Sequence, residues 1–389
     1  MSVKIGIIGC GGRIRAVLKQ IPEFKRSIEV AALFDPDPRS IKASLEELNP
    51  RARIYEDYRA LVADANISWV FIGSWNCHHR AHAVAAMEAG KNVFCEKPLA
   101  TNFEDALAVL EAQRRGGVTF SIGFSMRYSP HYRRIKEVLE AGTIGDIVSM
   151  EFNEVLHFDH GGYIHGDWRR LTANAGTHLL EKCCHDIDLA HWMTRSLPVR
   201  VASFGGLDFF TPRNRHIADE VGQGPNGRRA FQGWKGLVDL DPFTSDKDIV
   251  DNQVAILEFA NRTRATFHTN CSSSFPERRA FLCGTRGTLR ADVGLARVEV
   301  RRHGYDDTPT ESYVTPMGPH AGGDVILGLE LQATLLEGAP PRASLEDGLA
   351  SAITCFAIDE AMATGQVVDL RPFWRRAGIG LPVAAAARV

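Results

Sequence analysis

The first third of the chain alternates short apolar runs with segments of helical periodicity, and this alternation is the feature that most limits the possible folds. The apolar runs have the length of buried strands and occupy residues 5–8, 30–34, 69–72, 93–95 and 119–123. The segments at 79–89 and 106–114 have the spacing of helices. Parallel strands need a long crossover between them, which a helix usually provides. The sequence therefore predicts an α/β fold that begins with a doubly wound parallel sheet.

A glycine-rich turn at residues 9–12 joins the first predicted strand to a segment of helical spacing. Gly9 allows a tight turn, Gly11 lets the backbone approach a pyrophosphate, and the amides at the helix start face the anion. Ile14 stands where the fingerprint has its third glycine, and an ordinary strand-to-helix turn could have the same pattern. The turn is a candidate dinucleotide site, with Gly9, Gly11 and Gly12 as its contacts.

An acidic residue, Asp35, ends the next predicted strand, where dinucleotide-binding folds place the carboxylate that holds the ribose hydroxyls. A carboxylate at this position would repel the 2′-phosphate of NADP, so the sequence favours NAD. Arg39 is close enough in the sequence to keep NADP possible. The alternative is that Asp35 only forms a turn within its Asp-Pro-Asp-Pro sequence. Taken with the glycine turn, Asp35 predicts dinucleotide binding.

A charged pair, Glu96-Lys97, followed by Pro98, comes directly after the apolar run at 93–95. Charged groups are costly to keep away from water, so a strand end that carries them usually opens into a site. Proline biases Lys97 away from helical geometry and holds it extended. The sequence predicts that Lys97 lies at the carboxyl edge of the sheet, where α/β folds bind ligands. A surface ion pair beside a turn is the alternative.

After residue 145 the pattern changes to strands that alternate apolar and polar residues, as in an antiparallel sheet with one covered face. The expected strands are residues 147–155, 200–204, 253–259, 264–270, 280–283 and 296–301. The predicted organisation is a dinucleotide-binding domain at residues 1–125 and a second, α+β domain at residues 126–389.

Two further segments of the second half have a predicted structure. Residues 211–245 form a long irregular segment that could cap a site or reach a neighbouring subunit. A final helix is predicted at residues 345–363, with Ser344 and Asp347 as an approximate capping box.

The segment at residues 174–192 combines an apolar helix face with several ionisable residues. Glu181 and His185 are four residues apart, so both project from one side of a helix. His185 is the candidate general base, because an imidazole can both take up and release a proton near neutral pH. A hydrogen-bonded core histidine is the alternative. Lys182 is a further ionisable group, and the sequence leaves open whether Glu181 or Lys182 faces the substrate.

Histidines outside this helix are candidate substrate contacts. The spacing of His157, His160 and His165 matches no closed zinc signature, so no metal site is predicted. These residues fit a polar substrate loop better, with His157 as the candidate contact. His320 lies in a glycine-containing loop that could reach a sugar or could be a plain turn before a helix.

The chain resembles the Gfo/Idh/MocA oxidoreductases, which include glucose–fructose oxidoreductase and inositol dehydrogenases. The resemblance covers nearly the whole chain and rests on the glycine turn, Asp35, Asn76, His79, Glu96-Lys97-Pro98, Arg127-Tyr128-Ser129-Pro130, residues 142–145, Trp168-Arg169 and His185-Asp186-Ile187-Asp188. It implies an N-terminal Rossmann domain and a second domain with a large open, mostly antiparallel sheet. Because this sheet often forms a subunit interface in the family, a homo-oligomer, a dimer or a tetramer, is expected.

The resemblance also implies roles for individual residues. Lys97 would contact nicotinamide or substrate and take part in proton transfer, with His185 and Glu181 as the other catalytic residues. The expected cofactor-binding residues are Gly9, Gly11, Gly12, Asp35, Ser74, Asn76, His79, Glu96, Lys97, Arg127, Trp168 and Arg169. The expected substrate contacts are Lys97, His157, Lys182, His185 and His320. Glu181 and Cys183 depart from the family pattern, which has aspartate and glycine at these positions.

Composition limits the remaining classes of function. The net charge of −2 argues against nucleic-acid binding, and no apolar run is long enough to cross a membrane. Cysteines without a disulfide-like spacing fit a cytoplasmic protein.

The predicted function is that of an NAD(P)-dependent dehydrogenase, which moves a hydride between nicotinamide and a secondary hydroxyl or ketone of a sugar, sugar derivative or cyclitol. An NAD-dependent enzyme that cleaves glycosides through transient oxidation and elimination is the alternative. A non-catalytic cofactor-binding regulator ranks last because Lys97 and His185 are both present.

Overall fold

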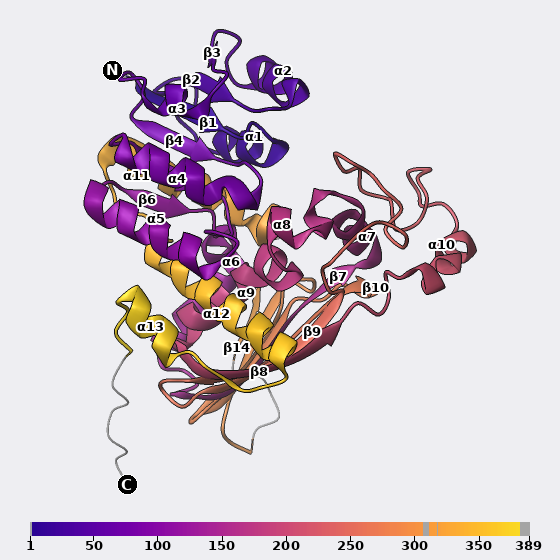
Figure 1. Ribbon diagram of the computed structural model, residues 1–389. Coiled ribbons are helices and arrows are strands. Elements are labelled where there is room, and N and C mark those ends of the chain that lie inside the picture. Colours follow the sequence, from indigo (N-terminus) through magenta and orange to yellow (C-terminus); the bar gives the residue numbers. More distant parts are fainter. Residues whose placement is uncertain (1, 306–310, 317, 382–389) are drawn as a thin grey trace. The chain divides into compact units, whose positions relative to one another are not determined.

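The computed structural model describes residues 2–305, 311–316 and 318–381 (Figure 1). The chain forms two compact units. The first unit comprises Met1–Ser129 and Gly318–Ala352, and the second comprises Pro130–Met317 and Ile353–Val389. The first unit therefore includes a returning segment, residues 318–352, that falls within the second domain as predicted from the sequence.

The first unit is built on a six-stranded sheet in which every neighbouring pair of strands is parallel. Its strands are β1 (Val3–Ile8), β2 (Ile28–Phe34), β3 (Arg53–Ile54), β4 (Trp69–Ile72), β5 (Asn92–Cys95) and β6 (Phe120–Ile122). The strand order is β3-β2-β1-β4-β5-β6. Successive strands from β1 to β3 are therefore added on one side of β1, and those from β4 to β6 on the other side. The predicted doubly wound Rossmann sheet is confirmed, and only the two-residue β3 is additional.

Helices connect these strands, including the two predicted at residues 79–89 and 106–114. They are α1 (Gly12–Lys19), α2 (Pro38–Glu47), α3 (Tyr58–Val62), α4 (His79–Glu88) and α5 (Phe103–Gly116). Asp37 caps α2 by accepting a hydrogen bond from the Arg39 amide, and Asn102 caps α5 in the same way through Asp105.

The returning segment joins the first unit through backbone contacts. It contains α11 (Gly323–Glu337) and the start of α12 (Leu345–Thr364). The Ile122 amide donates a hydrogen bond of 3.1 Å to the Ala343 carbonyl, beside the edge strand β6. In α11, a Cβ at Gly328 would lie 2.2 Å from the Gln20 carbonyl oxygen, so only glycine permits this close packing against the end of α1.

The second unit is built on a nine-stranded sheet of order β14-β13-β12-β11-β7-β10-β9-β8-β15. Its strands are β7 (Ile147–His157), β8 (Pro198–Gly206), β9 (Asn252–Phe259), β10 (Arg264–Ser273), β11 (Arg279–Gly284), β12 (Gly287–Asp292), β13 (Arg297–Arg302), β14 (Glu311–Val314) and β15 (Val368–Asp369). The pairing is antiparallel except between β7 and β10, so the prediction of a mostly antiparallel sheet is confirmed.

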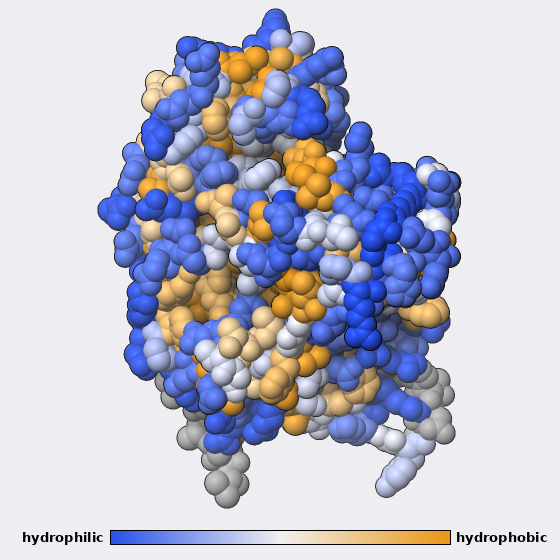
Figure 2. Space-filling view, turned by 45° about the vertical axis from the view of Figure 1, so that its right-hand side comes forward, coloured by the Kyte–Doolittle hydropathy of each residue, from blue (hydrophilic) through white to orange (hydrophobic). Residues whose placement is uncertain are grey.

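One face of this sheet is covered and the other is exposed along β8, β9 and β10, where buried and exposed residues alternate. On the covered side, α9 (His178–Thr194) contacts β7, and α6 (Pro130–Glu140) contacts β13. On the exposed side, Phe204 of β8 lies opposite Val254 of β9, and Ile256 follows on the same face. Figure 2 shows apolar patches among polar and charged residues on the face in view.

A long excursion, residues 207–249, leaves the sheet after β8 and returns before β9. Its regular structure is limited to a 3-10 turn (Pro212–Asn214) and the short helix α10 (His216–Val221). Figure 1 shows the excursion beside α7 (Phe158–Gly166), and its Phe210, Phe231 and Phe243 pack in one buried cluster with Ile164 of α7. The segment predicted to be irregular therefore shares a small buried core with α7 and the neighbouring strands.

Two negative findings apply only to the described residues. None of the helices in residues 2–305, 311–316 and 318–381 is long and apolar enough to cross a membrane. In the same part of the chain, no group of three or more His, Cys, Asp or Glu side chains could hold a metal ion.

Candidate active site

The glycine turn of the first unit forms a cradle at the carboxyl end of β1. Gly9 has a φ of +86°, and a Cβ there would lie 2.1 Å from the Ser74 amide nitrogen, so only glycine fits. Apart from Gly11 itself and its two chain neighbours, no described atom lies within 4 Å of a Cβ built on Gly11, which leaves open space beside the backbone. Gly11 caps α1 without a side-chain hydrogen bond, and α1 begins at Gly12. The cradle therefore has the free space and the helix-end amides that a pyrophosphate needs.

Asp35 lies beside this cradle, at the end of β2. Its carboxylate accepts hydrogen bonds from the Cys10 amide at 2.6 Å and the Asp37 amide at 2.7 Å. Burial raises the pKa of Asp35. The side chain of Arg39, which kept NADP possible, instead donates to Asp37 at 3.0 Å. The structure thus places a fixed carboxylate next to the glycine turn and directs the nearby arginine to another partner.

The segment that follows β4, up to the first residue of α4, contains three of the predicted cofactor residues. Ser74 forms a hydrogen bond of 2.9 Å with His82, and Asn76 is buried at the start of a 3-10 turn (Asn76–His78). His79 is fully buried, with Nδ1 2.7 Å from the Pro98 carbonyl oxygen and Nε2 3.0 Å from that of Ser74. Burial lowers the pKa of His79, and a neutral imidazole can donate to only one of these carbonyls at a time. His79 therefore connects the ends of β4 and β5 from inside the fold.

The end of β5 holds the Glu96-Lys97-Pro98 motif, in which the Lys97–Pro98 peptide bond is cis. Glu96 is buried, and its carboxylate accepts a hydrogen bond of 2.9 Å from Arg13 Nε and one of 3.3 Å from the Lys97 amide. A Cβ at Gly123 would lie 2.8 Å from Glu96 Oε2, so the glycine after β6 makes room for this carboxylate. The half-buried Lys97 follows directly.

Arg13 connects this motif to the returning segment. Its Nη1 donates to Asp324 at 2.9 Å, and Asp324 is also 3.0 Å from His320 Nδ1. Burial alone would raise the pKa of Asp324, but the hydrogen bonds from His320 and Arg13 lower it. His320, predicted as a substrate contact, therefore lies in the first unit with Arg13, which the sequence prediction did not include.

Arg127, a predicted cofactor contact, is committed to the returning segment as well. It donates to Asp347 at 2.9 Å and to the Arg342 carbonyl at 3.2 Å. Asp347 also accepts from the Ser344 amide at 2.8 Å, while the Ser344 hydroxyl accepts from the Asp347 amide at 3.2 Å. The predicted capping box is thus present, and Arg127 is anchored to it.

In the second unit, Glu181 of α9 is bound to Arg169. Arg169 Nε donates to Glu181 at 3.0 Å, and its Nη1 donates to the Tyr163 hydroxyl at 2.7 Å. The guanidinium also lies over the Trp168 ring, 4.3 Å from its centroid. The predicted pair Trp168-Arg169 and the predicted acid Glu181 are therefore parts of one arrangement.

A second group of charges lies around Arg278. Its Nε and Nη2 donate to both oxygens of Asp186 at 2.8 and 2.7 Å, and its Nε is also 2.7 Å from Glu154. Glu154 lies 3.5 Å from the Lys182 ammonium. Burial raises the pKa of Asp186 to about 6, against the opposing effect of Arg278. His185, next to Asp186 on α9, is also buried.

His160 of α7 lies near the charges of Lys182, Glu181 and Arg169. Burial lowers the pKa of His160 to about 2, with a further contribution from the charge of Lys182 and an opposite one from Glu181. His157, predicted as a substrate contact, caps α7 by accepting a hydrogen bond of 3.2 Å from the Asp159 amide. We name as the polar cluster the residues Glu154, His160, Arg169, Glu181, Lys182, Asp186 and Arg278.

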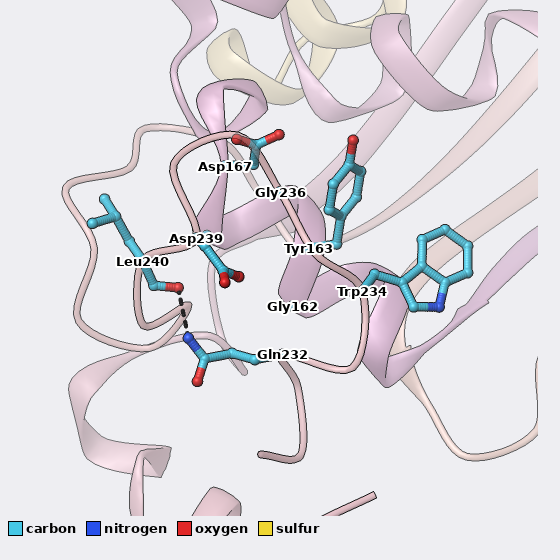
Figure 3. Close-up of a pocket in the computed structure, with 9 residues that line it drawn as sticks. Gly162, Tyr163, Asp167, Gln232, Trp234, Gly236, Asp239 and Leu240 are labelled. Carbon is cyan, nitrogen blue, oxygen red and sulfur yellow. Dashed lines mark hydrogen bonds between the residues drawn. The ribbon is translucent and has the colours of Figure 1, made fainter. Parts of the chain in front are cut away.

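A narrow crevice lies between α7 and the excursion (Figure 3). Tyr163 and Trp234 lie next to each other at one side, with ring centroids 5.9 Å apart, and Gln232 donates to the Leu240 carbonyl at 3.2 Å. The crevice is too tightly packed to admit a water molecule. It is a packing seam that holds the excursion on α7.

Two family models match this chain. Residues 3–124 match an oxidoreductase family with an NAD-binding Rossmann fold, and residues 132–290 match the GFO/IDH/MocA C-terminal domain. Inositol 2-dehydrogenase 2 of Saccharopolyspora erythraea is 35% identical over 382 residues, which cover 96% of this chain and 97% of that protein. Inositol 2-dehydrogenase of Burkholderia multivorans is 32% identical over 194 residues, so that the chain spans 55% of its length.

Solved structures show the same fold. Levoglucosan dehydrogenase in complex with NADH and levoglucosan has a TM-score of 0.76 at 20% identity, covering 95% of this chain and 100% of that chain. Myo-inositol 2-dehydrogenase from Lactobacillus plantarum has a TM-score of 0.70 at 21% identity, covering 95% of this chain and 99% of that chain.

Proposed function

The chain belongs to the GFO/IDH/MocA family of oxidoreductases, and on this premise we propose that it is an NAD-dependent dehydrogenase of a cyclic polyol, either a cyclitol or a sugar. The relatives named as inositol and levoglucosan dehydrogenases support the substrate class, because both names denote rings that bear secondary hydroxyls. The observation that carries the proposal is the glycine cradle with Asp35 fixed beside it.

The first unit would hold the dinucleotide. The amides of the turn at Gly9, Gly11 and Gly12 would bind the pyrophosphate, and Asp35 would bind the ribose hydroxyls. We favour NAD over NADP because Asp35 would repel a 2′-phosphate and Arg39 is engaged by Asp37. Ser74, Asn76 and Glu96 would line the nicotinamide half, with His79 acting indirectly through the positions of the β4 and β5 ends. When bound, NAD would supply the acceptor for a hydride.

The second unit would bind the polyol. The polar cluster offers both charged donors and carboxylate acceptors, which suit a ligand with several hydroxyls. Because Glu181 is bound to Arg169, we assign to Glu181 the role of holding Arg169 in place. Lys182, whose ammonium is 3.5 Å from Glu154, is assigned to bind a substrate hydroxyl. Trp168 would support the same guanidinium by lying beneath it.

Oxidation of a secondary alcohol requires removal of the hydroxyl proton as the hydride leaves the carbon. We propose that His185 takes up this proton as the general base. The ammonium of Lys97 would stabilise the developing alkoxide.

The exposed apolar residues of β8 and β9 also support the expected homo-oligomer. Phe204, Val254 and Ile256 are adjacent on the uncovered sheet face, and monomeric proteins seldom leave such residues together in water. We propose that a second copy of the chain covers them.

The proposed activity is tested by mixing purified protein with NAD and a panel of inositols, levoglucosan and aldoses, and following the formation of reduced nicotinamide. Formation of NADH with at least one ring polyol is the expected result. No NADH with any member, from protein shown by calorimetry to bind NAD, would refute the activity. Aglycone release from a nitrophenyl glycoside without net NADH would instead support glycoside cleavage.

A further inference from the structure

We propose that Trp234 is an aromatic platform that receives the C–H face of the substrate ring, an inference that rests on the proposed function. Trp234 belongs to the excursion and lies outside the motifs by which the chain resembles its family. Its indole is stacked on His160 of the polar cluster, with centroids 4.2 Å apart and planes inclined by 27°.

The backbone on both sides of Trp234 is fixed by two carboxylates of the α7 region. Asp159 accepts hydrogen bonds from the Phe231 amide at 2.8 Å and the Gly233 amide at 3.3 Å. Asp167 accepts from the amides of Leu237 and Val238, both at 3.0 Å. The backbone that carries the indole is therefore fixed before a ligand binds. This lowers the entropic cost of ordering the segment on binding.

The second observation is the exposure of the ring. Trp234 is 49% exposed although its indole is stacked on an imidazole, so a substantial part of its apolar surface faces outward. The seam behind it is closed, so this exposure does not belong to an internal cavity. An exposed aromatic surface held beside charged groups is an arrangement suited to a ligand with both kinds of surface.

Two ring contacts, to His160 and to Tyr163, place the indole beside the polar cluster. His160 lies against the indole and is influenced by the charges of Lys182 and Glu181. Tyr163 is 5.9 Å from the indole and accepts a hydrogen bond from Arg169.

A cyclitol or pyranose ring matches this combination chemically. Its hydroxyls point outward from the ring edge, while its axial C–H groups form an apolar face. The indole would take the C–H face, and the cluster would take the hydroxyls. An open-chain polyol has no fixed C–H face and would gain less from the platform.

Three substitutions at Trp234 test the platform. Trp234→Ala and Trp234→Leu should each raise the KM for a cyclic polyol by about 5- to 10-fold, the range of an aromatic contact, with kcat changed less than about 3-fold. Trp234→Phe should restore most of the loss, and the KM for NAD should not change. Leu237→Ala is the matched control, because Leu237 lies on the same segment and is 51% exposed.

The outcomes separate the two proposals. If the wild-type protein binds NAD but oxidises no ring polyol, the proposed function fails, and the platform fails with it. If the wild type is active and Trp234→Ala and Trp234→Leu leave the KM unchanged, the platform is refuted while the function stands. A lower oligomeric state of Trp234→Ala with an unchanged KM would also refute it, by making Trp234 a subunit contact.

Discussion

Removal of Arg278 should destabilise the second unit strongly and in a pH-dependent way. Arg278 pairs with Asp186 and Glu154, and the Lys182 ammonium lies 3.5 Å from Glu154. In Arg278→Met the carboxylates of Asp186 and Glu154 would stay buried, with much less positive charge beside them to offset their own charge. Losing one partner of a buried ion pair costs about 3–5 kcal/mol, so we expect a loss of this size in the free energy of unfolding near neutral pH.

The pH dependence follows from Asp186. The folded pKa of Asp186, about 6, lies above the unfolded value, so the folded state binds the proton more tightly. The free energy of unfolding therefore falls as the pH rises through the interval between these two pKa values. Without Arg278 the folded pKa should rise further, which extends the interval upward. The loss caused by Arg278→Met should therefore be larger at about pH 7.5 than at about pH 5, where the carboxylates can be protonated.

Chemical denaturation followed by circular dichroism at the two pH values measures this effect. Arg279→Met is the matched control, because Arg279 is the next residue, is 44% exposed, and pairs with Glu151 at 2.6 Å. An exposed pair of this kind contributes less than about 1 kcal/mol. Equal losses for the two variants, or a loss for Arg278→Met that does not change with pH, would refute the reasoning.

Three further predictions concern the cofactor, the chemistry and the assembly. Lys97→Ala and His185→Ala should each lower kcat by at least about 100-fold in the NADH assay, and near-normal rates in both would remove their catalytic assignment. Asp35→Asn should raise the ratio of NADP to NAD efficiency by about 10-fold because it removes the repelling charge, and an unchanged ratio would show that Asp35 does not select the cofactor. Ile256→Lys, on the exposed face of β9, should lower the mass measured by light scattering after size-exclusion chromatography, and an unchanged oligomer would place the interface elsewhere.

The elements of the first sheet could be predicted because their signals are local. A buried parallel strand is a continuous apolar run, as in β4, and the glycine turn directly follows β1. The capping box of Ser344 and Asp347 is local in the same sense, since its two partners are three residues apart. The two-residue strands β3 and β15 have no comparable pattern, and the sequence pattern does not predict β12 and β14 either.

The missing parts of the site depend on contacts between distant residues. Arg13 pairs with Asp324 across 311 positions, and Arg278 pairs with Asp186 across 92, so no spacing rule relates them. The one local signal that points to Arg13 as a site residue is its position, as a cation directly after the glycine turn. His157 and His160 have similar sequence surroundings, and only the fold of α7 shows that one caps the helix while the other faces α9 charges.

Hydride transfer from a ring carbon to nicotinamide is the central claim, and isotope transfer tests it most directly. The purified protein is mixed with NAD and myo-inositol deuterated at every ring carbon, and the reduced nicotinamide is analysed by mass spectrometry. We predict that the NADH formed carries deuterium. If the protein binds NAD but forms no reduced cofactor with this or any other deuterated ring polyol, or forms NADH without deuterium, the claim is contradicted.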